Sequence, residues 1–230
     1  MEWGFTMETK NHWHLAEFIC SERHFEKYKK QFMLGNIMPD INLFTYLQGH
    51  TYKKSIDMIY TNAKSLVEKK KWNGNSFYHL GIILHYIADY FTFPHNNTFT
   101  GSLKDHCAYE EKLHTRFLQF LHSKKQKYTK PISNNTSTDT YIIQDLTDTA
   151  IVGSSSMALQ KSLYNIQSIN ELFLLLEEKH HEYLSMMPSF QTDCQYIFSL
   201  TNIMAYFIPK FHEEYHCKNL STLLPSPPNS

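Results

Sequence analysis

The stretch that decides the fold is SFYHLGIILHYIADYFTFPHN, residues 76–96. Its apolar run is too long for a strand with polar ends, so it predicts a buried helix. Pro94 ends that helix, because proline has no backbone N–H and clashes with the preceding turn. His85 and Asp89 lie four residues apart and therefore on one helix face, and His95 follows the proline directly.

Two explanations fit a histidine and a carboxylate on an apolar helix. Polar groups that are buried without partners are costly. Either a charge-assisted hydrogen bond joins His85 to Asp89, or a metal cation binds both side chains. A single pair of this kind does not choose between the two explanations.

A second pair with the same spacing lies on the next predicted helix, residues 102–122. On that helix His106 and Glu110 share one stripe with Leu113. His95 lies between the two pairs in the chain. Two such pairs on consecutive helices are hard to explain as separate core hydrogen bonds, so the sequence favours a metal centre.

The composition of the 230 residues supports a helical metal-binding protein. Only 7 glycines occur, which argues against a turn-rich β protein, and the 14 histidines are a surplus. Lysine plus arginine balances aspartate plus glutamate at 22 each, so no global basic field is present and no stable complex with nucleic acid is expected. Some of the histidines lie in polar surroundings and are expected to be solvated; these are His180, His181, His212 and His216.

The cysteines and the N-terminal segment bear on the compartment. None of the four cysteines forms a C-x-x-C pair, so a thiolate zinc motif is not expected. The first residues, MEWGFTMETKNHWH, lack the basic start and apolar core of a signal peptide. No run of about 18 apolar residues predicts a membrane span. We therefore expect a cytoplasmic protein with reduced thiols.

The remaining chain is expected to form one domain over residues 1–220, with a disordered tail at 221–230. Gly35 and Pro39 predict a loop within residues 32–50. A polar surface loop is expected over residues 123–140, and residues 141–165 are ambiguous. Further helices are predicted over residues 9–31, 51–71, 168–185 and 190–216.

Two histidines compete for the inward face of the first helix. His12 is followed by Leu15 and Ile19 at helical spacing, which places it on the apolar face. His14 is followed by Glu17 at the same kind of offset, which turns it outward. Periodicity therefore prefers His12 as the functional residue.

The inward polar residues of the first half are nitrogen and oxygen ligands without sulfur. They are His12, Asp40, His50, His85, Asp89, His95, His106 and Glu110. Such ligands suit catalytic zinc, where an open position holds water. Eight ligands exceed one tetrahedral ion, so two or three zinc ions are expected. Paired ions about 3.5–4 Å apart are the usual device for phosphoester hydrolysis.

The segment HYIADYFTFPHN resembles the signature of the zinc-dependent phospholipase C family, with the same His, x3, Asp, x5, His spacing. HCAYE resembles the next His-x3-Glu segment of that family. The wider superfamily includes the S1/P1 nucleases, which share a trinuclear zinc arrangement. The resemblance covers residues 12–110 and implies an all-α, single-domain multi-helix bundle of the phospholipase C / P1 nuclease type.

The resemblance also implies a ligand arrangement. A first zinc would be held by Asp40, His50, His85 and Asp89, a second by His95, His106 and Glu110, and a third by His12 with Asp89 as a bridge. Asp40 would also be the catalytic general base, although capping a short helix is its ordinary alternative role. Secreted members bind the third ion through an N-terminal tryptophan. Here Trp3 lies behind Met1 and Glu2, so two ions are the alternative.

The leading hypothesis is a zinc metallohydrolase that cleaves a phosphodiester or phospholipid, most like a phospholipase C. Aromatic residues near the motif would either contact a membrane peripherally or belong to the core; they are Tyr90, Phe91, Phe93 and Phe99. Two alternatives stay open. One is a single-strand nuclease of the S1/P1 type, and the other is a non-catalytic zinc-binding helical protein. The oligomeric state is not predicted.

Overall fold

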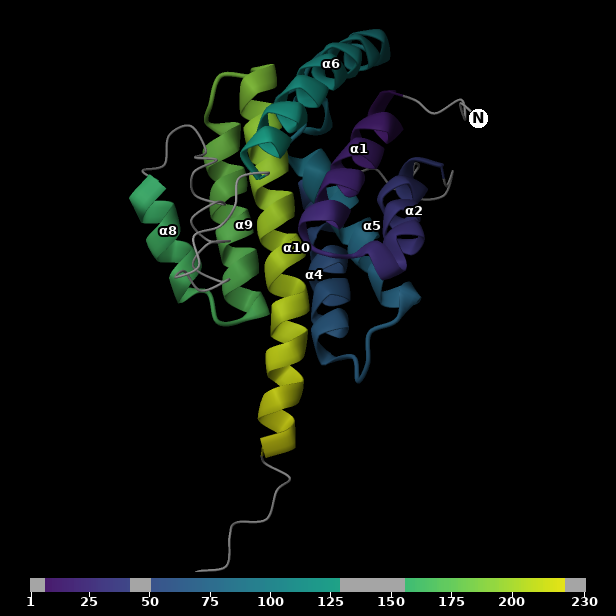
Figure 1. Cartoon of the computed structure of the whole chain (residues 1–230). Coiled ribbons are helices and arrows are strands. Elements are labelled where there is room, and N and C mark those ends of the chain that lie inside the picture. Colours follow the sequence, from purple (N-terminus) through teal and green to yellow (C-terminus); the bar gives the residue numbers. More distant parts are fainter. Residues whose placement is uncertain (1–6, 42–50, 129–155, 222–230) are drawn as a thin grey trace, which may run out of the picture.

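Figure 1 shows a computed structural model that describes residues 7–41, 51–128 and 156–221. These residues form α-helices and short 3-10 helices without a strand among them, so the all-α prediction is confirmed. In chain order the elements are α1 (Met7–Glu22), η1 (Glu26–Tyr28), α2 (Lys29–Ile41), α4 (Tyr52–Glu68), α5 (Gly74–Tyr90), η2 (Phe93–His95), α6 (Leu103–Tyr128), α8 (Ser156–Asn165), α9 (Ile169–Leu184) and α10 (Phe190–Ser221).

The central helix is α5, which contacts α2, α4 and α10. It begins with a capping box, in which Asn73 and Ser76 satisfy each other's backbone N–H groups. Leu80, Ile83 and most of its apolar run are buried, and Ile82 is partly buried, which explains a hydrophobic sequence over almost every face. The helix ends at Tyr90, a few residues before Pro94, so the predicted helix and its stop are confirmed.

The predicted loop at Gly35 and Pro39 is wrong, because α2 is helical through both residues. Gly35 faces α5, and a β-carbon there would overlap the carbonyl oxygen of Tyr78. Gly81 of α5 has the same relation to the carbonyl oxygen of Phe32. The two glycines therefore permit close approach of two helices rather than a turn. Pro39 lies in the last turn of α2, where it removes one backbone hydrogen bond without ending the helix before Ile41.

Other boundaries differ in detail. The single helix predicted over residues 9–31 is interrupted after α1, where His24 has a left-handed φ of 56°. Residues 123–128, expected in a loop, continue α6, whereas residues 129–155 lie outside the described part. Ser221 still belongs to α10, and the rest of the predicted tail lies outside the described residues. The domain boundary stays a prediction.

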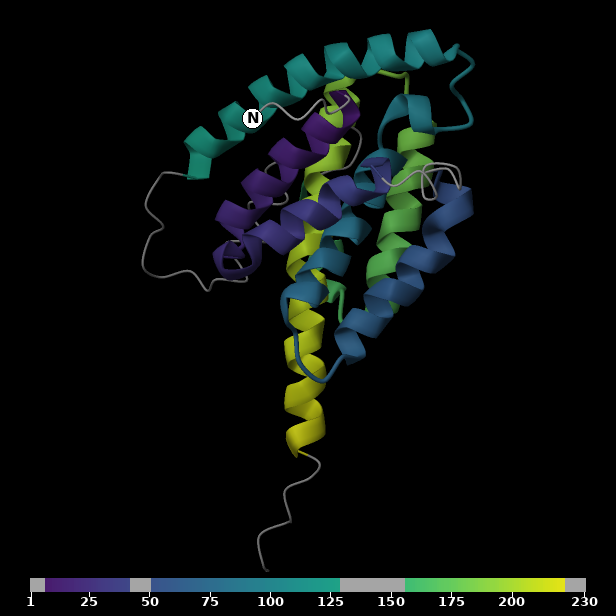
Figure 2. The same ribbon diagram turned by 90° about the vertical axis from the view of Figure 1, so that its right-hand side faces the viewer.

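Helix α10 runs through the bundle and contacts α4, α5, α6 and α9, while α6 lies across one end (Figures 1 and 2). Near its C-terminal end, His212 and His216 hydrogen bond the carbonyl oxygens of Val67 and Lys69. These half-buried histidines satisfy carbonyl groups at the end of α4 and are not simply solvated. Within the described ranges, no helix has both the length and the apolar character needed to cross a membrane.

Candidate metal centre

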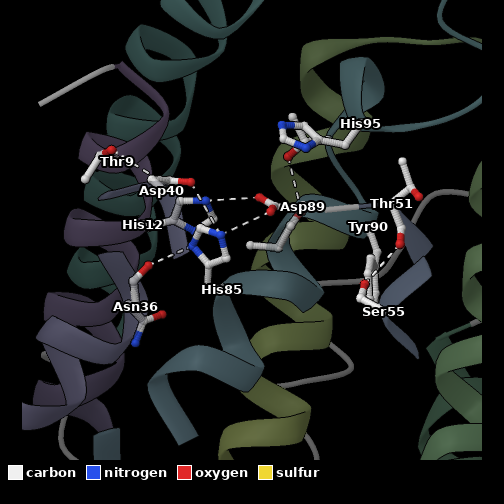
Figure 3. Close-up of polar contacts among 12 residues, drawn as sticks. Thr9, His12, Asn36, Asp40, Thr51, Ser55, His85, Asp89, Tyr90 and His95 are labelled. Atoms are coloured by element: carbon white, nitrogen blue, oxygen red, sulfur yellow. Dashed lines mark hydrogen bonds and ion pairs between the residues drawn. The ribbon is translucent and has the colours of Figure 1, made fainter. Parts of the chain in front are cut away.

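A first group of metal-ligand side chains lies where three helices meet. His12 comes from α1, Asp40 from the last turn of α2 and His85 from the middle of α5. Each offers one ligand atom, and these atoms lie within 4.8 Å of one another. The two imidazole rings are 4.0 Å apart between centroids, and Figure 3 shows them side by side next to Asp40. The group, called the first ligand group below, is almost closed to solvent, since His12 is only 4% exposed.

Asp89 lies one turn along α5 and faces the first ligand group (Figure 3). Its two oxygens lie 3.1 Å from Nε2 of His12 and 3.2 Å from Nε2 of His85. Burial alone would raise the pKa of Asp89, but the imidazoles of His85, His95 and His12 outweigh burial and hold this pKa well below its usual range. Asp89 is therefore an anion in the core of the bundle.

The tautomer of His85 points to a cation at this place. Its Nδ1 lies 2.8 Å from the carbonyl oxygen of Asn36, so Nδ1 carries the hydrogen and donates it. In a neutral ring Nε2 is then a bare acceptor, yet it faces carboxylate oxygens of Asp89 at 3.2 Å and Asp40 at 3.5 Å. Acceptors do not attract one another. Either this fully buried ring is charged, or a cation lies among the three groups.

The first ligand group fits zinc by two further observations. Nδ1 of His12 is buried and has no hydrogen-bond partner among the described residues. On Asp40, Oδ2 accepts a hydrogen bond of 3.1 Å from the hydroxyl of Thr9, which orients the carboxylate. Imidazole nitrogen together with carboxylate oxygen is a typical zinc donor set, and the carbonyl of Asn36 behind His85 is a typical second-sphere partner.

A second ligand group consists of His95 on η2 with His106 and Glu110 on α6. Oε1 of Glu110 lies 3.1 Å from Nε2 of His95 and 2.6 Å from Nε2 of His106. This group is more open than the first, because the side chain of His106 is 24% exposed and that of His85 is 0% exposed. The predicted i, i+4 pair thus lies on one face of α6 and meets His95 from a separate element.

The two ligand groups face one small cavity. Its walls include His12 and Asp89 from one side and His95 and Glu110 from the other. The volume is about 20 Å³, which is enough for one water-sized group. Asp40 is not among the described residues that line this cavity. Four of the predicted ligands, from three separate helices and the turn η2, therefore line a single cavity.

A comparison with known families agrees with this geometry. The sequence model described as zinc dependent phospholipase C matches residues 11–156. The chain belongs to this family. No curated protein and no solved structure matches it. The match contains both ligand groups of this zinc-dependent phospholipase C family protein, and the family implies zinc as the metal.

The structure groups the predicted ligands differently from the three-ion arrangement. His12 joins Asp40 and His85 in the first ligand group, and no separate third group occurs among the described residues. His50 lies outside the described residues. Of the two competing histidines, His12 is buried as periodicity predicts, whereas His14 is half-buried beside the ring of His114. The number of ions stays a prediction.

Sequence reasoning missed residues that support the second ligand group. Asp193 is completely buried and accepts hydrogen bonds from the N–H of Phe93 and the hydroxyls of Tyr109 and Tyr183. Burial raises the pKa of Asp193 to about 6, although these hydrogen bonds oppose the rise. The only signal in the sequence is an acidic residue at the start of an aromatic-rich helix. A favourable interaction with the helix dipole is the ordinary explanation for an acidic residue at that position, so the sequence did not point to a supporting role.

His180 was predicted to be solvated, and that prediction is wrong. Its ring is buried and stacked on Tyr52 at 4.1 Å with 10° between the planes. Burial lowers its pKa to about 4, so the ring is neutral at neutral pH. Its neighbours in the sequence are charged, which suggested an exposed position, but His180 lies on the buried face of α9.

The aromatic residues near the motif divide between core and rim. Tyr90 and Phe91 are fully buried, so these two side chains belong to the core. Phe93 and Phe99 are half-buried and pack edge to face at 5.4 Å. Aromatic residues on this family's motif are therefore mainly packing groups in this protein.

Proposed function

We propose that this protein is a zinc-dependent phosphodiester hydrolase, most like a phospholipase C. The observation that carries the proposal is the convergence of both ligand groups on one cavity, with the buried anion Asp89 between them. Membership of the zinc-dependent phospholipase C family supports the same reaction class. A purely structural metal site would not require a cavity between two groups of ligands.

The residues divide into two sets of zinc ligands. His12, Asp40, His85 and Asp89 would hold one ion, and His95, His106 and Glu110 would hold another. Zinc, when bound, lowers the pKa of water and stabilises negative charge on a phosphoryl oxygen. The substrate would reach the site from the side of His106, because this side chain is partly exposed whereas the first ligand group is closed to solvent.

The roles of the chain's own carboxylates follow from their contacts. Asp89 supplies fixed negative charge at the cavity wall and aligns the rings of His12 and His85. Asp40 is held by the hydroxyl of Thr9 and faces His85. Its proposed part as general base requires a water between it and the cavity, since Asp40 does not line the cavity directly.

The test is hydrolysis by the zinc-loaded protein of three substrates: p-nitrophenyl phosphorylcholine, phosphatidylcholine liposomes and single-stranded DNA. We expect cleavage of the first two and its loss on chelation. Glu110→Gln is expected to lower kcat/KM by at least about 100-fold, because it removes charge from the second ligand group. The matched control is Glu111→Gln, which changes the exposed neighbour and leaves the activity unchanged.

Each outcome separates the three hypotheses. Cleavage of the DNA alone would replace the phospholipase proposal by the nuclease alternative. Tight zinc binding without cleavage of any of the three substrates would favour the non-catalytic zinc protein. Activity that survives both chelation and Asp89→Asn would contradict a metal-dependent reaction at this site.

A further inference from the structure

The C-terminal helices α9 and α10 lie outside the matched residues 11–156, yet they contact the turn that carries His95. We propose that Asp193 and His180 are positioning residues, which hold η2 so that His95 meets the ligands of α6. The proposal rests on the metal centre proposed above. It assigns to the C-terminal part of the chain a direct role in building the second ligand group.

Asp193 joins both elements that supply the second ligand group. Its Oδ2 accepts hydrogen bonds from the N–H of Phe93 at 3.1 Å and from the hydroxyl of Tyr109 at 2.9 Å. Phe93 is the first residue of η2 and precedes His95 by two residues, while Tyr109 directly precedes Glu110. One buried carboxylate thus sets the spacing between the turn and α6.

The other oxygen of Asp193 points to a third element. Oδ1 accepts a hydrogen bond of 2.8 Å from the hydroxyl of Tyr183 on α9. A buried carboxylate is costly unless hydrogen bonds satisfy it, and an apolar residue would fill the same space at lower cost. Its presence is therefore explained by the hydrogen bonds that Oδ2 accepts from η2 and α6, rather than by packing alone.

His180 holds the other end of the turn through Asn96, the residue after His95. The amide nitrogen of Asn96 donates to the carbonyl oxygens of Tyr90 at 3.2 Å and Thr92 at 3.0 Å. Its amide oxygen is thereby directed at Nε2 of His180, which donates to it at 3.1 Å. The stacking of the His180 ring on Tyr52 fixes the orientation of that ring, and so the direction in which its Nε2 donates.

The turn requires such support because it is short. η2 contains three residues, and two backbone hydrogen bonds close it, from the N–H of His95 to the carbonyl oxygen of Thr92 at 3.0 Å and from that of Asn96 to Phe93 at 3.1 Å. Turns of this kind have poor hydrogen-bond geometry and little intrinsic stability. Residues that orient metal ligands from the second sphere typically change metal affinity by about 10- to 100-fold when they are mutated.

The experiment measures Co²⁺ binding by visible absorption. Each positioning substitution is made in two starting variants, each of which has one ligand group weakened. His12→Ala weakens the first ligand group and leaves the second to be titrated, and His106→Ala does the reverse. Asp193→Asn is expected to weaken Co²⁺ binding about 10- to 100-fold at the second ligand group and to leave the first group unchanged. His180→Ala is expected to act in the same direction.

The matched control is Tyr183→Phe, which removes only the hydrogen bond to Oδ1, the oxygen that does not contact η2. We expect it to leave Co²⁺ affinity within about 2-fold at both groups, a range smaller than a second-sphere effect. A merely structural role of Asp193 would weaken both groups together. That result would overturn the proposal.

Unchanged affinity at the second ligand group in both Asp193→Asn and His180→Ala would also overturn the proposal. If circular dichroism shows that Asp193→Asn does not fold, His180→Ala and Tyr109→Phe decide the question by the same titration. Failure of the proposed metal centre looks different, because the unmodified protein then binds no Co²⁺ at either ligand group, before any positioning variant is made. Failure of the proposed hydrolysis alone appears as Co²⁺ binding without cleavage of any of the three substrates, and it leaves the Co²⁺ titrations of the positioning variants unaffected.

Discussion

The first ligand group takes its side chains from three packed helices, whereas the second takes one of its three from a short turn. His85 is supported by the carbonyl of Asn36 in the helix against which α5 packs most closely. His95 is supported through its neighbours Phe93 and Asn96, which hydrogen bond residues of α10 and α9. The closed first ligand group, held by packed helices, and the more open second ligand group, held by hydrogen bonds to its turn, thus contribute to the same cavity.

The difference teaches how a helical bundle can build a two-part centre. Helix packing positions the closed group, because the glycines of α2 and α5 set a short distance between the two helices. Packing alone does not position the open group, which needs hydrogen bonds from distant parts of the chain. We expect perturbations to affect the two groups unequally, and the following predictions test that expectation in order of decreasing effect.

Removal of the metal is expected to have the largest effect on stability. Zinc at about 1,000 times its Kd adds about 4 kcal/mol to the free energy of unfolding, and chelation removes that contribution. Urea unfolding with zinc and with EDTA measures it. The first ligand group should account for the larger share, so His106→Ala should retain more of the zinc effect than His12→Ala does. Equal retention would contradict the comparison.

Gly35→Ala tests the helix contact behind the first ligand group. The added β-carbon overlaps the carbonyl oxygen of Tyr78, which is backbone and cannot move aside cheaply. We expect a loss of about 3 kcal/mol in the free energy of unfolding and weaker metal binding at the first group. Gly74→Ala is the control, because there the nearest atom, 3.2 Å away, belongs to the flexible side chain of Gln31. Equal losses would show that close approach is unimportant.

The pH dependence of stability tests the support of the second ligand group. Burial raises the pKa of Asp193 to about 6, so the folded protein holds this proton more tightly than the unfolded chain does. The stabilisation is therefore present at low pH and is lost as pH rises towards the folded pKa. Between about pH 4.5 and about pH 7.5, metal-free wild type should lose about 2 kcal/mol relative to Asp193→Asn.

The measurement is urea unfolding of both proteins in EDTA at the two pH values. The difference between the proteins isolates Asp193, since the other titrating groups are common to both. A difference that does not change with pH would mean that Asp193 titrates as in the unfolded chain.

Asn73→Ala is expected to have the smallest effect. It removes the capping box at the start of α5, which should cost about 1 kcal/mol in the free energy of unfolding. His85 lies about three turns further along the helix, so Co²⁺ affinity should not change at either ligand group. A marked loss of metal binding would indicate that the position of the whole helix depends on its cap.

Much of the centre could be predicted from sequence because its pairs are local. The i, i+4 spacing places His85 with Asp89 and His106 with Glu110 on single helix faces whatever the rest of the chain does. The prediction failed at Gly35 and Pro39, where a local turn signal is overridden by contact with α5. It failed again at His180, whose charged neighbours conceal its burial.

The sequence by itself determined the helical class, the end of α5 before Pro94 and the ligand types, since each depends on neighbours within one or two turns. Only the tertiary structure decided which ligands share a group and what holds them. The hydrogen bond from His85 to Asn36 joins residues 49 positions apart, and that from Phe93 to Asp193 joins residues 100 positions apart. Periodicity carries no information over such separations, because the packing of helices, not the pattern within one helix, brings those atoms together.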